Sequence, residues 1–458
     1  MIERLLNKKN LISFGFFAVF FHAVLTFSHY FYPADWLNIV DYVFLGIMGF
    51  AAILFFAKQQ FQIRFQPAQM TLLAFIAWYI VSCLSMTITF HSDWVTYNNS
   101  GLLNMAVSAV LAFSLGYITI RDGKKNPVGQ ILLHVLMLGW TLFIAYVLIV
   151  VFQGKEIITA SGGFIGVNEN NLLLNCNRNT TGAWEMLFFM GCCFMTMWCK
   201  QLPLKIVYGL SSAIHYIALT LSNSRASFLA ALIGFMAMMG VAVYLRLNQG
   251  GKPHKILFAV VAALAAGVIY YFVSNLVYLL YNLATGAEVS GRAFEAQAQT
   301  FSGREDVWRY SIQGIFSSLR SAIFGVTPAS VPELILQISN YTLREAMYTH
   351  NQFLEIAAGI GIPGLCIFLV WFGMIVRDSF KLYFVQKDTT LMLMIPIIIM
   401  ALMLMNMMEA LLVFYDYIHH YVFFLLCGLL YGRVNKPVEP KTLSRQELRN
   451  KERKKKKK

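Results

Sequence analysis

Apolar runs of transmembrane length follow one another along most of the chain. A helix needs about 20 predominantly apolar residues to cross the hydrocarbon core of a bilayer. The predicted spans cover residues 11–29, 37–57, 69–89, 101–119, 130–152, 181–198, 203–220, 226–245, 254–274, 352–375, 390–408 and 411–431. Glu409 and Asp416 interrupt the last two. The pattern predicts an all-α polytopic membrane protein with about twelve transmembrane helices. The first run lacks a small-residue cleavage site, so it is expected to remain as a helix.

The distribution of Lys and Arg predicts the orientation of these helices. Loops on the cytoplasmic side of a membrane carry an excess of both residues. With a cytoplasmic N-terminus, all but eight of the 36 Lys and Arg fall on the cytoplasmic side. The eight on the outer side are Lys155, Arg178, Arg225, Arg292, Arg304, Arg309, Arg320 and Arg344. An even number of helices also returns the C-terminus to the cytoplasm.

Composition and charge fit the same class of protein. Charged residues make up 13% of the chain, against about 25% in soluble domains. The net charge of +14 does not indicate a nucleic-acid-binding protein. Much of it comes from the end of the chain, which has no interleaved aromatic residues for base stacking. We therefore divide the chain into a transmembrane domain, residues 1–431, and a basic cytoplasmic tail, residues 432–458. The tail is expected to contact anionic membrane lipids or to be a solvated, disordered segment.

The cysteines and the acidic residues predict neither a metal site nor a cofactor. The seven cysteines are odd in number and lie mostly inside apolar runs, where a free thiol behaves as a small hydrophobic group. No Cys-x-x-Cys or Cys/His spacing typical of a metal site occurs. Neither a disulfide framework nor a bound metal is expected.

A large outer segment, residues 274–351, contains five arginines and no lysine. Guanidinium is the preferred partner for bidentate recognition of phosphate. The stretch SGREDVWRYSIQGIFSSL predicts an amphipathic helix, with Trp308 at an interfacial depth. Arg304 and Trp308 share one face of this helix, and Glu305 can pair with Arg309 on another. A surface helix stabilised by ion pairs is the alternative interpretation. A shorter outer segment, residues 153–180, precedes it.

Arg225 opens an apolar helix at the outer interface, in the sequence LTLSNSRASFLAALIGF. The three residues before it can cap this helix, and a helix N-terminus favours anions. Arg225 is therefore a candidate anion-binding residue. The alternative is a boundary residue that extends its charge toward water.

His350 stands at the outer start of the tenth predicted span, in YTHNQFLEIAAGIGIPGL. Its ordinary pKa near 6.5 lets it accept a proton at working pH. Asn351 and Glu355 follow within the first turns, and the glycines allow close approach of a neighbouring backbone. His350 is a candidate general base, although a histidine beside a membrane is more often structural.

Other ionisable residues lie inside or near the predicted spans. Asp416, His419 and His420 are functional suspects because charge is costly inside a membrane, but they can equally form a structural ion pair. His215 invites the same two interpretations. Glu185 lies near an outer helix start, where it could orient Arg178 or a substrate hydroxyl.

Four motifs in this order resemble the O-antigen ligase and O-antigen polymerase superfamily. They are NCNRNTTG before the sixth predicted span, SNSRASF around Arg225, GREDVW around Arg304 and THNQFLEIAAGIGIPGL around His350. Cys176 stands where the family more usually has proline. The HN-x-x-L pattern followed by glycines is the most specific of the four.

The resemblance implies a GT-C-like membrane glycosyltransferase. Such enzymes transfer a glycan from undecaprenyl pyrophosphate to a hydroxyl of a glycolipid or glycan acceptor, without a metal or nucleotide sugar. His350 would be the base, and Arg225 and Arg304 would bind the diphosphate. Supporting roles would fall to Asn351, Glu355, Arg178, Trp308 and Arg309. The reaction would invert the anomeric carbon and would take place at the outer face of the bacterial cytoplasmic membrane.

Three alternatives remain open at this point. Within the family, a ligase is favoured slightly over a repeat-unit polymerase or a teichoic-acid-type ligase. A lipid-linked glycan transporter is disfavoured, because transporters place polar elements at the membrane midplane and often repeat internally. A non-catalytic scaffold for envelope assembly is the third.

Overall fold

The computed structural model of the chain describes a defined set of residues. They are residues 43, 66–87, 109–110, 112–117, 127–155, 157–158, 164–167, 172–174, 178–249, 254–286, 304–340, 342, 348–386, 390–414 and 418–435. The predicted spans 11–29 and 37–57, apart from Val43, lie outside this set. Most of the predicted span 101–119 and nearly all of the basic tail also lie outside it.

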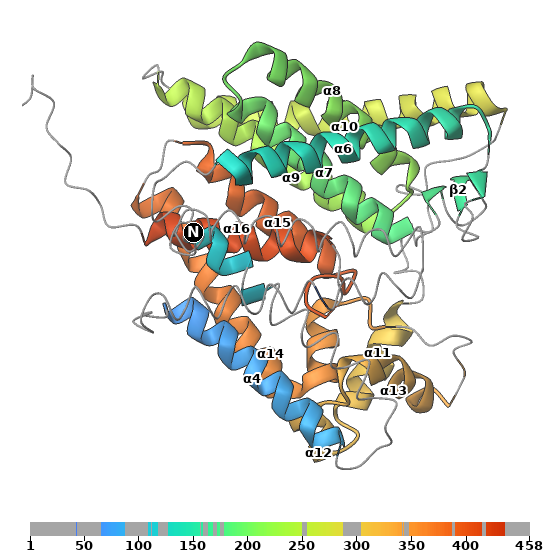
Figure 1. Cartoon of the computed structure of the whole chain (residues 1–458), viewed down its shortest axis with the longest axis vertical. Coiled ribbons are helices and arrows are strands. Elements are labelled where there is room, and N and C mark those ends of the chain that lie inside the picture. Colours follow the sequence, from blue (N-terminus) through green and yellow to red (C-terminus); the bar gives the residue numbers. More distant parts are fainter. Residues whose placement is uncertain are drawn as a thin grey trace, which may run out of the picture.

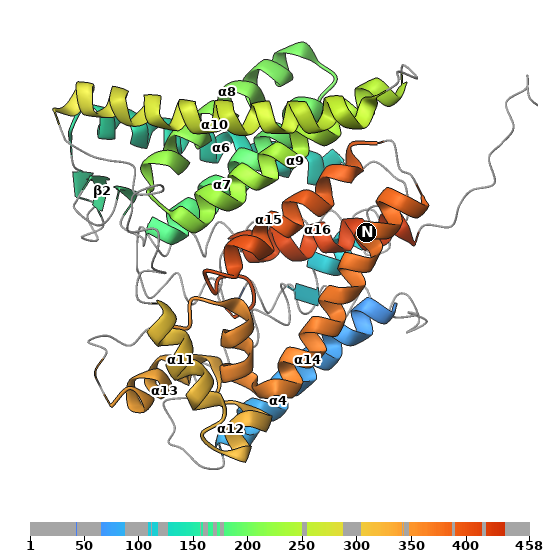
Figure 2. The ribbon, with the colours of Figure 1, turned by 180° about the vertical axis from the view of Figure 1, so that it is seen from behind.

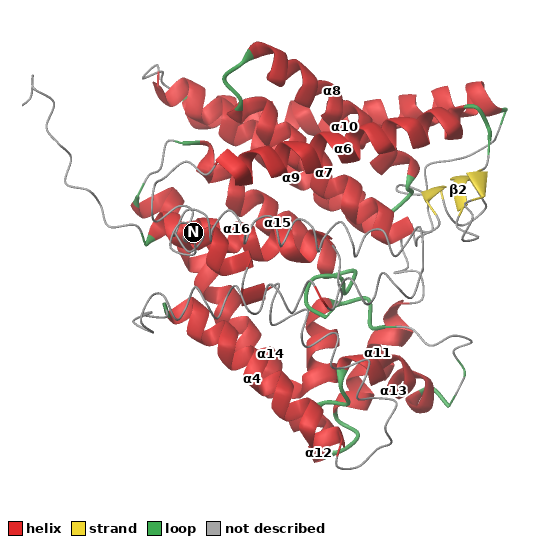
Figure 3. Cartoon of the chain, in the orientation of Figure 1, coloured by secondary structure: helices red, strands yellow, loops and turns green. Residues whose placement is uncertain are grey.

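Helices make up most of the described residues (Figure 3). The long ones are α4 (Pro67–Thr87), α6 (Pro127–Phe152), α7 (Arg178–Trp198), α8 (Leu202–Leu221), α9 (Arg225–Gln249), α10 (Lys255–Thr285) and α14 (Gln352–Phe380). The shorter ones are α11 (Arg304–Ile315), α12 (Leu319–Phe324), η3 (Pro328–Ser330), α13 (Val331–Ile338), η4 (Lys381–Val385), η5 (Leu391–Met394), α15 (Ile395–Asn406) and α16 (Ile418–Val434). The predicted helical class is confirmed.

Six of the described helices are long and apolar enough to cross a membrane. Their spanning parts are Pro67–Ser85, Ile131–Phe152, Leu202–Leu221, Arg225–Leu247, Lys255–Thr285 and Gln352–Val385. Each coincides with one of the predicted spans. The total of about twelve stays a prediction.

Two predicted boundaries need correction. The span predicted at 254–274 continues as α10 to Thr285, because apolar residues persist and Gly286 ends the helix in a left-handed conformation. The large outer segment therefore begins at residue 286. The last span was predicted at 411–431, but α16 begins at Ile418. The non-helical stretch before it, residues 407–414, carries Glu409.

A small antiparallel sheet adds to the helical fold between α6 and α7. Its strands are β1 (Ile157–Ile158), β2 (Phe164–Val167) and β3 (Leu172–Leu174), paired in the order β1-β2-β3. Ile165 of β2 pairs with both Ile157 and Leu174. The sheet lies toward the same end of the helices as α11 and α13 (right in Figure 1), which is the end predicted to face outward.

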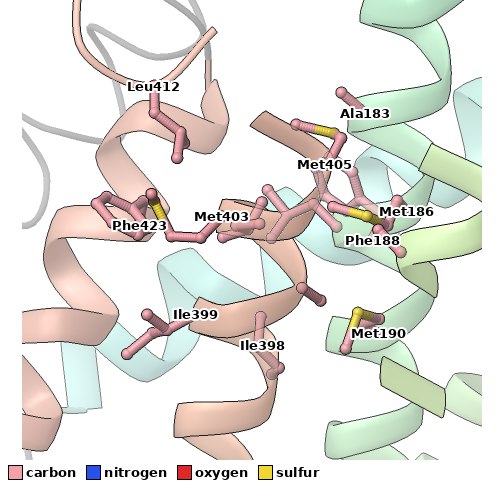
Figure 4. Packing of buried hydrophobic residues seen from close by; sticks show 14 of the residues in the cluster. Ala183, Met186, Phe188, Met190, Ile398, Ile399, Met403, Met405, Leu412 and Phe423 are labelled. Carbon is pink, nitrogen blue, oxygen red and sulfur yellow. The ribbon is translucent and has the colours of Figure 1, made fainter. Parts of the chain in front are cut away.

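The helices form two groups joined by α15. Helices α6 to α10 run together across the top of Figure 1, whereas α4 and α14 pack against each other below them. Helices α15 and α16 lie between the groups, as the view from behind in Figure 2 also shows. Buried methionines of α7, Met186 and Met190, face Ile398 and Met405 of α15 (Figure 4). This packing fixes the outer end of α15, which leads directly to Glu409.

A polar cluster is buried where α6, α7 and α8 meet. Glu185 and His215 are fully buried, and their Oε2 and Nδ1 atoms are 2.7 Å apart. The other carboxylate oxygen of Glu185 accepts a hydrogen bond of 3.0 Å from Trp140 Nε1. Thr141 contacts the other nitrogen of His215 at 2.9 Å. Both oxygens of Glu185 thus join α7 to the neighbouring helices α6 and α8; its predicted role in orienting Arg178 or a substrate stays a prediction.

Candidate functional site

Asn351 caps the outer end of α14 and shapes the turn that holds His350. Its side-chain oxygen accepts hydrogen bonds from the backbone N–H groups of Phe353 (3.0 Å) and Leu354 (3.2 Å). Its amide nitrogen donates to the Met407 carbonyl at 3.1 Å. His350 itself adopts a left-handed conformation with φ of 51°. The cap therefore joins the start of α14 to the stretch that follows α15.

Glu409 lies between Arg304 and His350. Its side chain is fully buried, whereas those of Arg304 and His350 are 17% and 14% exposed. Oε1 accepts a hydrogen bond of 2.5 Å from Arg304 Nη2, and Oε2 lies 3.1 Å from His350 Nδ1. Arg304 Nη1 also donates to the Met408 carbonyl. The structure thus brings two of the predicted site residues to one carboxylate.

This arrangement determines which histidine nitrogen is left to react. An ionised carboxylate only accepts hydrogen bonds, so His350 Nδ1 donates to Glu409. A neutral imidazole then carries an unprotonated Nε2, which is a proton acceptor. If Nε2 gains a proton, the adjacent Glu409 stabilises the positive charge. Arg304 uses two of its five N–H donors on Glu409 and Met408.

Glu355 and Gln352 hold the turn around His350 from inside. The fully buried Glu355 accepts a hydrogen bond of 2.8 Å from the backbone N–H of Thr349. Gln352 is fully buried too, and its oxygen accepts a hydrogen bond of 2.8 Å from the backbone N–H of Leu412. Glu355 therefore contacts the backbone before His350, and Gln352 ties α14 to the stretch that carries Glu409.

We expect Asn351→Ala to lower the free energy of unfolding by about 1–2 kcal/mol, since it removes an N-cap. The variant also loses the contact with Met407, so transfer activity should fall while some remains. Thermal unfolding of the purified protein and an activity assay measure the two effects. Asn351→Ser keeps a capping oxygen and should restore most of the stability. An equal loss in both variants would show that capping is not the reason.

Arg225 and Arg178 occupy a second location, where the N-termini of α9 and α7 meet. Ser224 Oγ donates to Asn179 Oδ1 at 3.3 Å. A Cβ atom at Gly182 would lie 2.4 Å from Ser224 Cβ, so the two helix starts approach very closely. Both helices pack against α15, which leads to Glu409. Arg225 and Arg178 thus begin helices that pack on α15, whereas Arg304 and His350 bind the carboxylate that follows α15.

Arg309 differs from its predicted pairing. It binds Asp306, three residues earlier, at 2.9 Å rather than Glu305, and both side chains are 58% exposed. Its guanidinium also lies over the ring of Tyr310, 5.0 Å from the centroid. Hydrogen bonds with Thr342 and Arg309 lower the pKa of the Tyr310 phenol. Trp308, predicted as a supporting residue, is half-buried on the same helix as Arg304.

Arg309→Ala is expected to change stability by less than about 0.5 kcal/mol, because exposed ion pairs contribute little. Transfer activity should stay close to that of the unaltered protein, since Arg309 has no contact with Glu409 or His350. Thermal unfolding and initial rates measure both quantities. A large loss of activity would instead place Arg309 in the substrate site.

The glycine-rich part of α14 holds the outer segment. The helix is interrupted at Ile360 and Gly361, where Gly361 has a φ of 80°. The interruption releases the carbonyl groups of Ala358 and Gly359. They accept hydrogen bonds from the backbone N–H groups of Val326 (2.9 Å) and Thr327 (2.7 Å), respectively. The close backbone approach predicted for these glycines is therefore made by the segment between α12 and η3.

Polar side chains from the outer segment, the start of α14 and the end of α15 thus converge at one end of a bundle of apolar helices. This architecture is that of a polytopic membrane protein with a polar cluster at one end of its apolar helices. Residues 209–369 match the family model described as O-antigen ligase, which confirms the predicted resemblance to that superfamily. The matched region includes Arg225, Arg304 and His350. No curated protein matches the chain. The family and the apolar helices together indicate a bacterial inner-membrane protein.

Glu409 is the main residue of this site that the sequence did not identify. It was considered only as an interruption of an apolar run, although an ionisable residue inside such a run is a functional suspect. His420, an intramembrane ionisable residue that the sequence also singled out, is buried, and its Nδ1 donates a hydrogen bond to the Leu412 carbonyl. Asp416 and the side chain of His419 lie outside the described residues. Within the described part of the chain, no group of three or more His, Cys, Asp or Glu could hold a metal ion.

Proposed function

We propose that the protein transfers a glycan from undecaprenyl pyrophosphate to an acceptor hydroxyl at the outer face of the bacterial cytoplasmic membrane, as an O-antigen ligase. The family match supports a role in cell-surface polysaccharide biosynthesis. The observation that carries the proposal is the contact of Glu409 with both His350 and Arg304. It places a proton acceptor and a cation beside each other.

The proposed reaction begins with the acceptor hydroxyl next to His350. Its oxygen attacks the anomeric carbon of the donor sugar while its proton passes to His350 Nε2. The bond between that carbon and the diphosphate oxygen breaks, and undecaprenyl pyrophosphate leaves with the bonding electrons. In-line attack inverts the anomeric configuration. Glu409 stabilises the imidazolium that forms, and no step needs a metal ion.

Cations stabilise the leaving group in this proposal. Negative charge grows on the diphosphate as the bond breaks, and guanidinium groups fixed in advance stabilise it. Arg225 lies at the N-terminus of α9, where the helix dipole also favours an anion. Arg178 lies at the neighbouring start of α7, and Arg304 keeps donors that Glu409 and Met408 do not use. Loss of one such donor typically lowers turnover by about 100- to 1,000-fold.

The test is reconstitution with an undecaprenyl-pyrophosphate-linked glycan and a set of acceptors. The unaltered protein should release undecaprenyl pyrophosphate and label an acceptor, with equal rates in EDTA. Arg225→Ala and Arg304→Ala should lose release, whereas Arg309→Ala should keep it. Full release by folded Arg225→Ala and Arg304→Ala would contradict the assigned site, and loss in EDTA would contradict the mechanism.

Labelled lipid A core indicates a ligase, and labelled repeat units indicate a polymerase. Movement of intact donor across the bilayer without release would indicate a transporter.

Glu409→Gln tests the residue that joins the two halves of the site. The amide still accepts a hydrogen bond but carries no charge, so Arg304 and a protonated His350 lose their anion. We expect stability to fall by about 2–3 kcal/mol, less than for a fully buried pair, because Arg304 keeps contact with solvent. Turnover should fall while KM for the donor changes little. Glu409→Asp, which keeps the charge, should retain more activity than Glu409→Gln. The reverse order would show that the charge is not what matters.

A further inference from the structure

Three large apolar side chains are exposed between the end of α11 and the start of α12. Ile312 is exposed, and Phe316 and Leu319 are 65% and 78% exposed. Ile312 and Phe316 are one helical turn apart, and Phe316 N donates to the Ile312 carbonyl. Leu319 is the first residue of α12, after a short non-helical turn. The exposed side chains at the opposite end of α11 are polar, namely Glu305, Asp306 and Arg309. The helix thus has a polar start and an apolar end.

The apolar end is attached to the side of a membrane-spanning helix. The ring of Phe324, at the end of α12, stacks on Trp78 of α4 with centroids 5.7 Å apart and planes 11° apart. Ser82 donates to the Phe324 carbonyl, and Arg320 donates to the Ser85 carbonyl. Figure 1 shows α12 against the end of α4. These contacts fix the position of α12 along α4.

That position lies below the outer end of α4. The helix ends at Thr87, nine residues after Trp78. At 1.5 Å per residue, Phe324 therefore lies about 14 Å down the helix from its end. Between Trp78 and its end, α4 exposes the apolar side chains Ile80, Val81 and Leu84. The start of α12 lies nearer the end of α4, because Arg320 donates to the carbonyl of Ser85, the last residue of the spanning part of α4. Leu319, next to Arg320, is therefore near the end of this exposed apolar surface.

We propose that the segment from Ile312 to Leu319 lies in the outer leaflet, where Phe316 and Leu319 contact the acyl chains of phospholipids. Exposed aromatic and aliphatic side chains next to polar ones are typical of segments that lie in a membrane interface, and here the apolar end of α11 would be the end that enters it. The sequence suggested such a helix, but placed Trp308 at the interface. In the structure Trp308 is half-buried one turn after the start of α11, and the exposed apolar side chains lie nearer the end of the helix.

This placement connects the bilayer to the candidate site through one helix. Arg304, the first residue of α11, binds Glu409, and the last turn of α11 leads to Phe316. The helix is 12 residues long, which corresponds to about 18 Å. The outer leaflet thereby fixes the tilt of α11 and the position of Arg304. The inference concerns lipid contact and does not depend on the proposed reaction.

The test uses the full-length protein in vesicles of phosphatidylethanolamine and phosphatidylglycerol with radiolabelled acyl chains and no lipid-linked glycan. The photoreactive residue p-benzoylphenylalanine replaces Phe316 in one variant and Leu319 in a second. In a matched control it replaces Glu305, which is exposed at the polar end of α11. Size-exclusion chromatography before irradiation selects folded protein, and labelled adducts are counted after denaturing electrophoresis.

We expect phospholipid adducts at positions 316 and 319 to exceed those at position 305 several-fold. Equal labelling at all three positions would overturn the proposal, because it would place the edge in water. A cross-link between two copies, seen as a band of doubled mass at 316 or 319, would overturn it in favour of a subunit interface. Because no donor or acceptor is present, the result is independent of whether the protein transfers glycan.

Discussion

Replacing His350 should lower the rate of glycan transfer by about 100- to 10,000-fold, the usual contribution of a general base. Nδ1 of this residue is held by Glu409, so Nε2 is the nitrogen left to take the proton of the acceptor hydroxyl. His350→Asn is the preferred variant, because His350 has a φ of 51° and asparagine tolerates the left-handed region well. The initial rate of undecaprenyl pyrophosphate release measures the effect.

Protein abundance in the membrane and thermal stability provide the control for this variant. Both should remain near those of the unaltered protein, since asparagine tolerates the left-handed backbone at this position and its amide can donate to Glu409 in place of Nδ1. Raising the pH should not restore the transfer rate of the His350→Asn variant, because the asparagine side chain does not take up and release a proton as the imidazole does. A folded His350→Asn protein with full turnover would exclude His350 as the base.

Gly361→Ala is expected to disrupt the attachment of the outer segment and to abolish transfer. Gly361 has a φ of 80° and a ψ of 171°, a conformation that is essentially restricted to glycine. A Cβ atom there would lie 2.0 Å from the Ile323 carbonyl oxygen, so the backbone of one segment must move. Backbone strain and overpacking together should cost about 3–6 kcal/mol. Limited proteolysis within residues 304–340 and the transfer rate measure the effect.

The same helix offers a matched control for Gly361. Gly373 also lies in α14, but a Cβ added there meets no atom within 4 Å. Gly373→Ala should be neutral or stabilising by up to about 1 kcal/mol, because alanine is the better helix former. Equal losses in both variants would indicate that any change in α14 is damaging. Full activity of Gly361→Ala would show that the outer segment is held elsewhere.

The apolar pattern predicted the long helices well, because a helix must be apolar over about 20 residues to cross the bilayer and the sequence shows such runs directly. The span predicted at 352–375 begins one residue after the Asn351 cap, as the structure shows. The pattern failed where a polar residue is paired in the folded chain. The predicted span 411–431 includes a non-helical stretch, and α16 begins only at Ile418. Hydrophobicity alone does not show which polar residues of an apolar run find a hydrogen-bond or ion-pair partner in the folded chain.

The candidate site could be predicted in part for a similar reason. His350 and Arg304 stand in recognisable motifs, and the structure places both on Glu409. Glu409 lies 59 residues from His350 and 105 from Arg304 along the chain. It lies in no motif, and it reaches the site through the packing of α15 against α7 and α9 and the hydrogen bonds of Asn351 and Gln352 to residues 407 and 412. The relation of Arg225 to this carboxylate likewise depends on how two helix starts pack on α15.

The buried pair of Glu185 and His215 has a consequence for how the chain enters the bilayer. Helix α7 is not among the helices apolar enough to cross alone, and an unpaired carboxylate at the centre of a span costs about 2.5–3.5 kcal/mol at insertion. Three residues, 199–201, separate α7 from α8, which carries His215. We therefore expect the translocon to release α7 and α8 as a helical hairpin. Synthesis of α8 would then have to be complete before α7 leaves the translocon for lipid.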